Sequence, residues 1–251
     1  MTKKLAIVMA AGKGTRMKSE LPKVLVPALG RPIIDYVLDA LEESGIDETV
    51  VIVGYRADDV KIALAGRKNL SFALQEEQRG TGHAVMCARA ALERHHGPVL
   101  VVTGDSPMLQ PSSVRALFEE FERRPTACLM GTAHKENPYG LGRVVRDANG
   151  DFLRIVEEKD ASEEERRLTE VNMSTYLFDA QELLQALGKL QPNNKQGEYY
   201  ITDGPGILKD EGKRVAALAV LKPVEALSIN TVDDLAAVEA ALREEGKGEK
   251  K

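Results

Sequence analysis

A short glycine-bearing segment near the start of the chain has the residue types of a phosphate-binding turn. It reads AAGKGTRM at residues 10–17. Glycines let the backbone approach phosphate oxygens, and Lys13 and Arg16 add positive charge. The segment matches neither familiar phosphate loop, because Met17 stands where the dinucleotide fingerprint needs a third glycine and the P-loop pattern is absent. Taken alone, it predicts either a triphosphate-binding turn or an ordinary strand-to-helix turn with solvated cations.

A second lysine follows this turn in the segment ELPKVL at residues 20–25. The composite pattern, GxGTRM and then LPKVL, is long and specific. It resembles the signature of sugar-phosphate nucleotidyltransferases, which join a nucleoside triphosphate to a sugar 1-phosphate and release pyrophosphate. The resemblance implies that Arg16 binds the β and γ phosphates and that Lys23 stabilises the charge that builds on the α-phosphoryl group. The alternative for Lys23 is an exposed surface lysine.

The stretch LQEEQRGTGHA at residues 74–84 resembles the uridine-binding segment of one branch of this family, the bacterial N-acetylglucosamine-1-phosphate uridyltransferases. A glutamine amide offers both a donor and an acceptor to an imide such as uracil, and glycines let backbone groups join in. The resemblance implies that UTP is bound by Ala11, Gly12, Gly14, Gln75, Gly80 and Thr81. A solvated strand end and a helix-entry turn are the alternatives for this stretch. His83 is interpreted as a packing or helix-start residue, since this reaction takes no proton from a neutral hydroxyl.

The segment TGDSP at residues 103–107 closes an expected strand, and ligands gather at the carboxyl ends of strands in α/β sheets. By the same resemblance Asp105 is a magnesium ligand, and its partner is an asparagine near the end of the domain. The segment SIN at residues 228–230 supplies that asparagine. We therefore expect Asp105 and Asn230 to hold one Mg²⁺ through hard oxygen atoms. A cap or turn role is the alternative for Asp105.

Four later segments resemble the sugar side of the same uridyltransferases. They read YGLGR at 139–143, IVEEKDA at 155–161, EVN at 170–172 and GEYYITD at 197–203. By position, Gly142, Glu157 and Asn172 would contact an N-acetylhexosamine. The alternatives are a hairpin glycine, a solvated charge and a strand-end asparagine.

The chain departs from the family's pattern beside these sugar residues. Met173 and Ser174 stand where Thr-Gly is usual, and Leu141 stands where the family has a tyrosine. The resemblance covers about residues 5–232. Bifunctional members continue into a hexapeptide-repeat β-helix that carries an acetyltransferase, and no such repeat occurs here. We therefore expect no acetyltransferase in this chain, which is either a stand-alone enzyme or a piece of a longer one.

Alternating β-branched runs and helical patterns predict a mostly parallel sheet with helices on its faces. Strands are expected at 5–9, 49–53, 70–75 and 99–102, and helices at 33–43, 58–64, 82–94, 162–168, 180–187 and 203–211. A hairpin is expected around the turn at 147–150, as a lid or substrate wall rather than part of the central sheet. A last helix is expected from Thr231, whose hydroxyl can cap it.

The expected fold class is therefore α/β, a Rossmann-like mixed and mostly parallel sheet of the nucleotide-diphospho-sugar transferase type, with a small β-rich sugar-binding insertion. We divide the chain into a nucleotidyltransferase domain at 1–232 and a C-terminal helix with a frayed tail at 233–251. Within the domain, residues 1–126 are expected to bind mainly nucleotide and residues 127–232 mainly sugar.

Charge and composition indicate which partners and which cellular location to expect. The 251 residues carry 34 Lys and Arg against 39 Asp and Glu, a net charge of -5, which argues against a nucleic-acid partner. No apolar run approaches the roughly 20 residues that span a bilayer. We expect a cytoplasmic protein with no membrane partner. Cys87 and Cys128 lie in separate segments without metal-ligand spacing, so both are expected to be reduced.

Together these observations predict uridylyl transfer from UTP to N-acetylglucosamine 1-phosphate with Mg²⁺ as cofactor, a step in cell-envelope precursor synthesis. Two alternatives stay open: the same chemistry on another pair, such as UTP with a different hexosamine 1-phosphate or dTTP with glucose 1-phosphate, and a non-catalytic nucleotide-sugar sensor. A degenerate sensor should have lost at least one of Arg16, Lys23, Asp105 and Asn230, and all four are present. The motifs do not indicate the oligomeric state.

Overall fold

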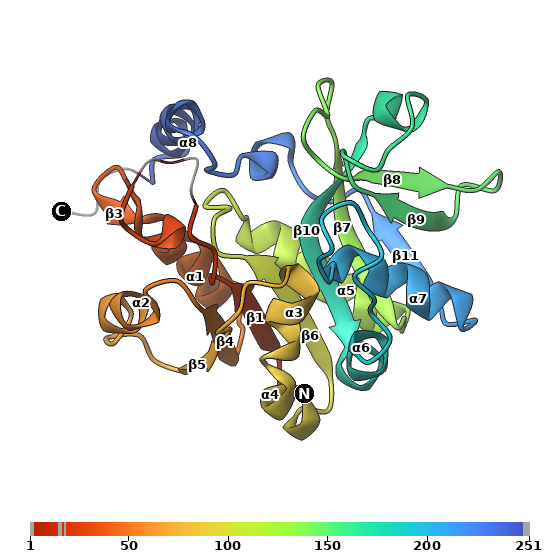
Figure 1. Cartoon of the computed structure of the whole chain (residues 1–251), viewed down its shortest axis with the longest axis horizontal. Coiled ribbons are helices and arrows are strands. Elements are labelled where there is room, and N and C mark those ends of the chain that lie inside the picture. Colours follow the sequence, from red (N-terminus) through yellow and green to blue (C-terminus); the bar gives the residue numbers. More distant parts are fainter. Residues whose placement is uncertain (1–2, 15–16, 18, 248–251) are drawn as a thin grey trace.

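A nine-stranded sheet runs through the molecule (Figure 1). The computed structural model describes residues 3–14, 17 and 19–247. The main strands are β1 (Leu5–Met9), β4 (Glu48–Val53), β5 (Leu70–Leu74), β6 (Pro98–Thr103), β7 (Cys128–His134), β10 (Glu170–Asp179) and β11 (Val215–Leu218). They lie in the order β11-β7-β10-β6-β1-β4-β5. All neighbours pair in parallel except β10, which runs antiparallel to both β6 and β7. The predicted mixed, mostly parallel α/β sheet is confirmed.

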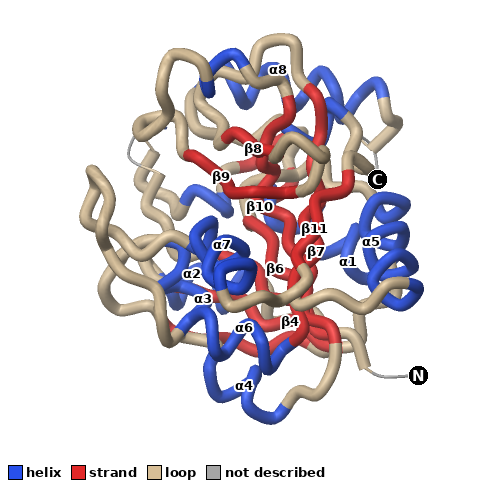
Figure 2. Tube along the Cα trace, turned by 90° about the vertical axis from the view of Figure 1, so that its right-hand side faces the viewer, coloured by secondary structure: helices blue, strands red, loops and turns tan. Residues whose placement is uncertain are grey.

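Helices cover both faces of this sheet. They are α1 (Ile33–Glu43), α2 (Ala57–Ala63), α3 (Thr81–Met86), α4 (Arg89–Arg94), α5 (Pro111–Arg123), α6 (Ala180–Leu187) and α7 (Gly204–Asp210). The last helix, α8 (Val232–Glu244), instead packs in a separate cluster with Ala28 and Tyr36. Figure 2 shows α1 and α5 on one side of the sheet and α3, α4, α6 and α7 on the other. Successive side chains of a strand point to opposite faces. Leu5 and Ile7 accordingly pack in the core beneath α3, α4 and α6, whereas Ala6 and Val8 pack in the core beneath α1, α2 and α5.

Two predicted helices differ from the structure. The helix expected at 82–94 is two short helices, α3 and α4, because the Ala88 amide donates to the carbonyl of Val85, only three residues back, and the backbone tightens there. The helix expected at 162–168 is a single 3₁₀ turn at Glu165–Arg167. That turn stops because Leu168 is already extended toward β10.

The second half of the chain contributes more to the central sheet than the sequence predicts. The expected hairpin is present as β8 (Arg143–Arg146) and β9 (Phe152–Val156). It is not separate from the main sheet, because Arg143 pairs with Val171 of β10. Strands β7 and β10, which we did not predict as strands of the main sheet, lie inside it, between β11 and β6. The position of β10 between β6 and β7 brings the expected sugar residues next to the nucleotide half.

Helix α8 begins as predicted. The Thr231 hydroxyl accepts from the Asp234 amide at 3.2 Å, and the Asp234 carboxylate accepts from the Thr231 amide at 2.8 Å. Figure 1 shows both α8 and the β8–β9 hairpin in the upper part of the view, α8 at the left and the hairpin at the right. Cys87 and Cys128 are both free thiols, as expected. In the described part of the chain, no helix combines the length and apolar character needed to cross a membrane.

Candidate functional site

The glycine turn and the TGDSP segment start side by side. Strands β1 and β6 are parallel, and Met9 at the end of β1 is in register with Thr103 at the end of β6. The Gly104 amide donates to the Met9 carbonyl at 2.9 Å, which holds the two turns together. The motifs therefore meet where the carboxyl ends of parallel strands place ligands in open α/β sheets.

Lys23 is held against the glycine turn rather than exposed on the surface. It opens a 3₁₀ turn at Lys23–Leu25, in which the Leu25 amide donates to Pro22 and Val24 is buried. Gly14 has a φ of +68°, and a Cβ there would lie 2.6 Å from the Lys23 Cβ. Glycine thus lets the turn pack directly on the lysine stem. Only 14% of the Lys23 side chain is exposed, so it is not a solvated surface lysine.

The Lys23 ammonium lies between Asp105 and Asn230. It forms an ion pair with Asp105 and donates to the Asn230 Oδ1 at 2.7 Å. The asparagine is fixed in turn, since its amide nitrogen Nδ2 donates to the Ser228 hydroxyl at 3.1 Å. The Ile229 amide also donates to the Asp105 carbonyl at 3.2 Å. Three residues predicted from separate motifs therefore meet at one point.

The oxygens of Asp105 and Asn230 converge on a single cation position. Both are hard donors, the kind that Mg²⁺ prefers. The ammonium of Lys23 occupies that position and acts as a stand-in for a cation. No cluster of three or more His, Cys, Asp or Glu side chains suited to a metal occurs in the described part of the chain. The pair therefore fits an ion that substrate oxygens and water complete, rather than one caged by the protein.

A cavity of about 380 Å³ lies at the carboxyl ends of β1 and β6. It is lined by all six residues expected to bind nucleotide, Ala11, Gly12, Gly14, Gln75, Gly80 and Thr81, together with Lys23, Thr103, Asp105 and Glu198 among others. This volume falls within the range of small-molecule sites. The predicted nucleotide residues thus share one cavity with Lys23 and Asp105.

Gln75 is buried, and its amide nitrogen is already used. Nε2 donates to the Gly80 carbonyl at 3.1 Å and to Nδ1 of His83 at 3.1 Å. A carbonyl oxygen only accepts, so the Gly80 contact fixes which end of the Gln75 amide faces inward. The side-chain oxygen remains for a ligand, and the expected two-sided contact with an imide is not available in this arrangement. His83 therefore orients the glutamine, in keeping with its predicted non-catalytic role.

The GEYY segment contacts the nucleotide stretch, which corrects its assignment to the sugar side alone. The Gly82 amide donates to the Tyr199 carbonyl at 2.7 Å, and the Tyr199 amide donates to the Arg79 carbonyl at 2.9 Å. Gly80 has a φ of +104°, and a Cβ there would lie 2.5 Å from the Tyr199 carbonyl oxygen. The glycines of this stretch are therefore needed for close packing against GEYY. Farther along the segment, a hydrogen bond joins Thr202 to Glu157, so GEYYITD touches both halves of the site.

A second, smaller cavity of about 170 Å³ adjoins the first. It is lined by Leu141, Asn172, Met173, Ser174, Ser228 and others, and it shares Thr103 and Asp105 with the nucleotide cavity. The two departures from the family at Met173 and Ser174 therefore face this second cavity. Asp105 stands at the junction of the two.

Gly142 and Glu157 lie beside Asn172 but are not among the residues that line the second cavity. The Asn172 amide donates to the Gly142 carbonyl at 2.8 Å. A Cβ at Gly142 would lie 3.5 Å from the Asn172 Cβ and 3.5 Å from the Glu157 Oε2. Burial raises the pKa of Glu157, the hydrogen bond with Thr202 opposes this, and the nearby Asp203 adds repulsion. The three predicted sugar residues therefore form one polar cluster.

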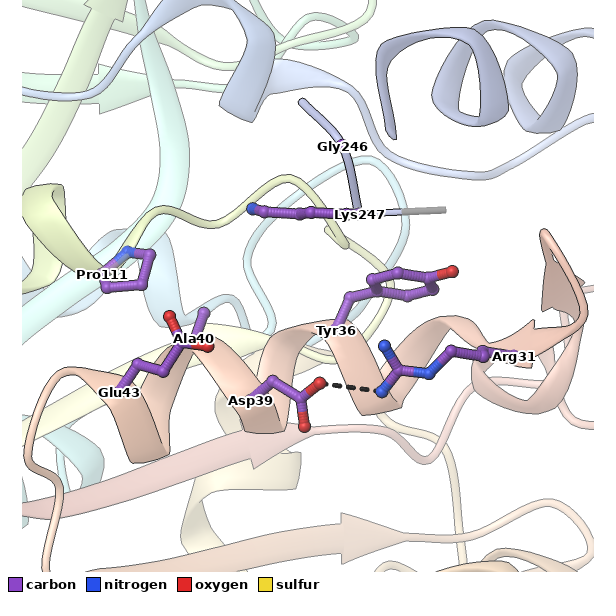
Figure 3. A pocket seen from close by; sticks show the side chains of 8 residues that line it. All are labelled: Arg31, Tyr36, Asp39, Ala40, Glu43, Pro111, Gly246 and Lys247. Atoms are coloured by element: carbon purple, nitrogen blue, oxygen red, sulfur yellow. Dashed lines mark hydrogen bonds and ion pairs between the residues drawn. The ribbon is translucent and has the colours of Figure 1, made fainter. Parts of the chain in front are cut away.

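Several residues of the site fall outside the predictions or outside the structure. Arg16 lies outside the described residues, so its predicted phosphate contact stays a prediction. Thr103 and Glu198 line the nucleotide cavity but were not singled out, although both lie inside quoted motifs. A third hollow, drawn in Figure 3, lies against α1 and the C-terminal residues Gly246 and Lys247. It contains none of the predicted site residues.

Ser174 has a backbone conformation that favours glycine. Its φ is +49°, and β10 bulges between Asn172 and Thr175. The Ser174 amide donates to the Asn172 side-chain oxygen at 3.1 Å, which stabilises the bulge. The glycine that the family usually carries here would adopt this conformation without steric cost.

We expect Ser174→Gly to raise the free energy of unfolding by up to about 1 kcal/mol, because the relief of left-handed strain exceeds the added entropy of glycine in the unfolded chain. Urea unfolding measures the difference. Ser71→Gly in strand β5 is the matched control, since Ser71 is exposed and is not among the residues with positive φ. The control should destabilise the chain by about 0.5 to 1 kcal/mol. If both variants lose stability, the backbone at Ser174 is not strained.

Comparison with known proteins identifies the family of this chain. The family model described as a MobA-like NTP transferase domain matches residues 6–199. The chain is 47% identical over 230 residues to the bifunctional protein GlmU of Enterococcus faecalis, covering 92% of this chain and 50% of the relative. It is 44% identical over 240 residues to the GlmU of Clostridium novyi, covering 96% and 52%. The chain thus spans about half the length of the curated relatives it matches.

Solved structures share the fold. A UDP-glucose pyrophosphorylase complexed with UDP-glucose superimposes with a TM-score of 0.76 at 18% identity, covering 98% of this chain and 100% of that chain. A Bacillus anthracis protein assigned as a glucose-1-phosphate thymidylyltransferase, in complex with sucrose, superimposes with a TM-score of 0.79 at 19% identity, covering 96% of each chain. The resemblance to sugar-phosphate nucleotidyltransferases, drawn from the motifs, is confirmed. This chain belongs to the MobA-like NTP transferase family.

Proposed function

We propose that this chain transfers a uridylyl group from UTP to N-acetylglucosamine 1-phosphate, giving UDP-N-acetylglucosamine and pyrophosphate. One observation carries the proposal: two cavities meet at Asp105, with the Lys23 ammonium beside the junction. One cavity is lined by Ala11, Gly12, Gly14, Gln75, Gly80 and Thr81, which are expected to bind nucleotide. The other holds Asn172, expected to bind sugar. The reacting phosphates of two substrates would meet at such a junction, and the similarity to GlmU proteins supports the choice of substrates.

Catalysis in this proposal depends on position and charge. An oxygen of the sugar phosphate, already anionic, attacks the α-phosphorus of UTP in line, and pyrophosphate leaves from the opposite side. No general base is required. Lys23 moves from Asp105 and Asn230 to the α-phosphoryl oxygens and stabilises the charge that grows there. Arg16 is proposed to hold the β and γ phosphates.

Asp105 and Asn230 are the residues that would hold Mg²⁺. The ion, when bound, supplies positive charge to the phosphates. The side chain of Asn230 is anchored by Ser228, and the backbone at Asp105 is held by the Ile229 amide, so the two residues stay side by side. The chain's own part is to present those two oxygens at the junction of the cavities.

Nucleotide choice is proposed to depend on Gln75. Its Nε2 is held by Gly80 and His83, so Oε1 is the atom that can accept the N3–H of a uracil ring. Cytosine presents an unprotonated N3 at that position and would be rejected. Thymine presents the same imide, which keeps dTTP as the competing nucleotide.

Sugar choice is the finer part of the proposal. The acetamido group would be bound by backbone at Gly142, and the ring hydroxyls by Glu157 and Asn172. A buried site that hydrogen-bonds a polar group of its substrate is left with unpaired donors or acceptors when the substrate lacks that group. The resulting loss of binding free energy exceeds the ~1 to 3 kcal/mol that a difference in size alone produces. N-acetylglucosamine 1-phosphate should therefore exceed glucose 1-phosphate in kcat/KM by at least about tenfold.

A pyrophosphate-release assay with UTP and dTTP against both sugar phosphates measures this preference. Met173→Thr with Ser174→Gly restores the usual family residues and should sharpen the preference if Met173 and Ser174 crowd the second cavity. Equal use of glucose 1-phosphate by the unmodified chain would refute the N-acetylglucosamine assignment and leave nucleotidyl transfer standing. Release from no pair would favour the non-catalytic sensor.

The remaining expectations stay proposals. They include cytoplasmic location, small-molecule partners without nucleic acid or membrane, and the division into a nucleotide part at 1–126 and a sugar part at 127–232. The sheet itself is continuous across that division, since β10 pairs with β6.

A further inference from the structure

Arg143 opens β8 with a guanidinium that is buried beside the sugar cluster. It has the largest of the fully buried side chains in the described chain, and 2% of that side chain is exposed. It donates to the Leu141 carbonyl, to the Glu158 Oε2 at 2.7 Å and to the Arg166 carbonyl at 3.3 Å. Its Nε has no partner among the described atoms. An apolar side chain would fill this space without an unpaired buried donor, so packing alone does not explain an arginine here.

Glu158 holds the same turn from its other side. Its carboxylate accepts from the Gly140 amide at 3.2 Å and lies 3.4 Å from the Arg166 Nε. Burial favours the neutral form of Glu158, but the hydrogen bonds from Arg143 and Gly140 outweigh it and lower the pKa. Glu158 is therefore charged at neutral pH. The Arg143–Glu158 pair clamps the turn at residues 138–142 through the Gly140 amide and the Leu141 carbonyl.

The clamped turn leaves one backbone donor unpaired. The Leu141 amide donates to Pro138 at 3.2 Å, and the Gly142 carbonyl accepts from Asn172 at 2.8 Å. Among the residues that the structure describes, none accepts the Gly142 amide hydrogen. Asn172 and Glu157 flank this position. A fixed N–H group therefore stands beside two polar side chains.

We infer that the Arg143–Glu158 pair positions the Gly142 amide to donate to the carbonyl oxygen of an acetamido group, and so sets the preference for N-acetylated over plain hexose 1-phosphates. The inference rests on the proposed function. Arg143 and Glu158 act on the substrate only through the Gly142 amide, so they are positioning residues. A donor held in place by such a clamp binds its acceptor without a further loss of freedom, and a displacement of about 1 Å is enough to weaken it.

Arg143→Lys tests the inference. A lysine keeps the charge, but one ammonium cannot replace a planar guanidinium that bonds Leu141, Glu158 and Arg166 together. The ratio of kcat/KM for N-acetylglucosamine 1-phosphate to that for glucose 1-phosphate should fall at least about tenfold, through a higher KM for the N-acetylated substrate. The KM for UTP and the kcat/KM for glucose 1-phosphate should change by less than about twofold.

Arg146→Lys is the matched control. Arg146 lies in the same strand and pairs with the buried Glu170 through two contacts of 2.6 Å, and it also donates to the Ala217 carbonyl. None of these groups adjoins Gly142. This variant should lose comparable stability in urea unfolding and keep the wild-type substrate ratio. Glu158→Gln, which keeps the shape and removes the charge, is the second variant if Arg143→Lys does not fold, and its ratio should fall in the same direction.

The results of these experiments distinguish a failure of the proposed function from a failure of the positioning inference alone. If the wild-type chain releases no pyrophosphate from UTP with either sugar phosphate, the proposed function fails. If the wild-type chain prefers the N-acetylated substrate and Arg143→Lys and Glu158→Gln keep that preference, only the positioning inference fails. An equal fall of the ratio in Arg146→Lys would also overturn it, because general loosening of the strand would then account for the effect.

Discussion

Lys23→Ala is expected to lower kcat at least a hundredfold while changing the dissociation constant for UTP by only a few fold. The charge that Lys23 meets grows chiefly in the transition state, and one such contact is worth on the order of 3 kcal/mol. The geometry supports this assignment, because the side chain lies in the nucleotide cavity and is 14% exposed. Single-turnover kinetics with saturating substrates measures the chemical step, and equilibrium binding of UTP without sugar phosphate measures affinity.

Two further variants show whether the loss of activity comes from the missing charge of Lys23. Lys23→Met removes the charge but retains most of the stem that packs against Gly14, and it should lose activity as fully as the alanine variant. Lys61→Ala removes a lysine from α2 that lines neither of the two cavities. Its side chain is 40% exposed and pairs with Asp58, so this variant should retain wild-type activity. A kcat for Lys23→Ala within a few fold of wild type would end the catalytic assignment.

The parts that local sequence predicts well are those with local causes. The bounds of α1 and α6 agree with the expected ranges, because each shows apolar residues at helical spacing. The Thr231 cap follows from a hydroxyl and a carboxylate three residues apart. The position of the site also follows, since glycine-rich turns at the ends of β1 and β6 must lie at one edge of a parallel sheet.

The parts that local sequence does not predict depend on distant contacts. Asn230 reaches Lys23 across 207 residues, and only the resemblance to a family, which paired Asn230 with Asp105, brought Asn230 into the predicted site. Strand β10 lies antiparallel in the middle of the sheet, a register that no pattern within its own ten residues specifies. The inward orientation of the Gln75 amide depends on the Gly80 carbonyl and the His83 ring. Periodicity and composition carry no information about tertiary partners of this kind.

Chelation with EDTA is expected to abolish activity, and added Mg²⁺ should restore it. Asp105 and Asn230 supply two oxygens at one cation position, and substrate phosphates and water must complete the six ligands that Mg²⁺ takes. Asp105→Ala should therefore raise the Mg²⁺ concentration needed for half-maximal rate by at least about tenfold, because a charged ligand is lost. Asp39→Ala, which removes a carboxylate of α1 that pairs with Arg31, should leave that concentration unchanged.

Metal binding to the free chain gives a readout that does not depend on turnover. The Lys23 ammonium occupies the position between the Asp105 and Asn230 oxygens, so under the proposed function we expect it to compete with a divalent cation until phosphate draws it away. Titration of Mn²⁺ followed by electron paramagnetic resonance should show weak binding to the wild-type chain, tighter binding to Lys23→Met and none attributable to this site in Lys23→Met with Asp105→Ala. Unchanged Mn²⁺ affinity across all three chains, with full activity of Asp105→Ala at low Mg²⁺, would place the metal elsewhere.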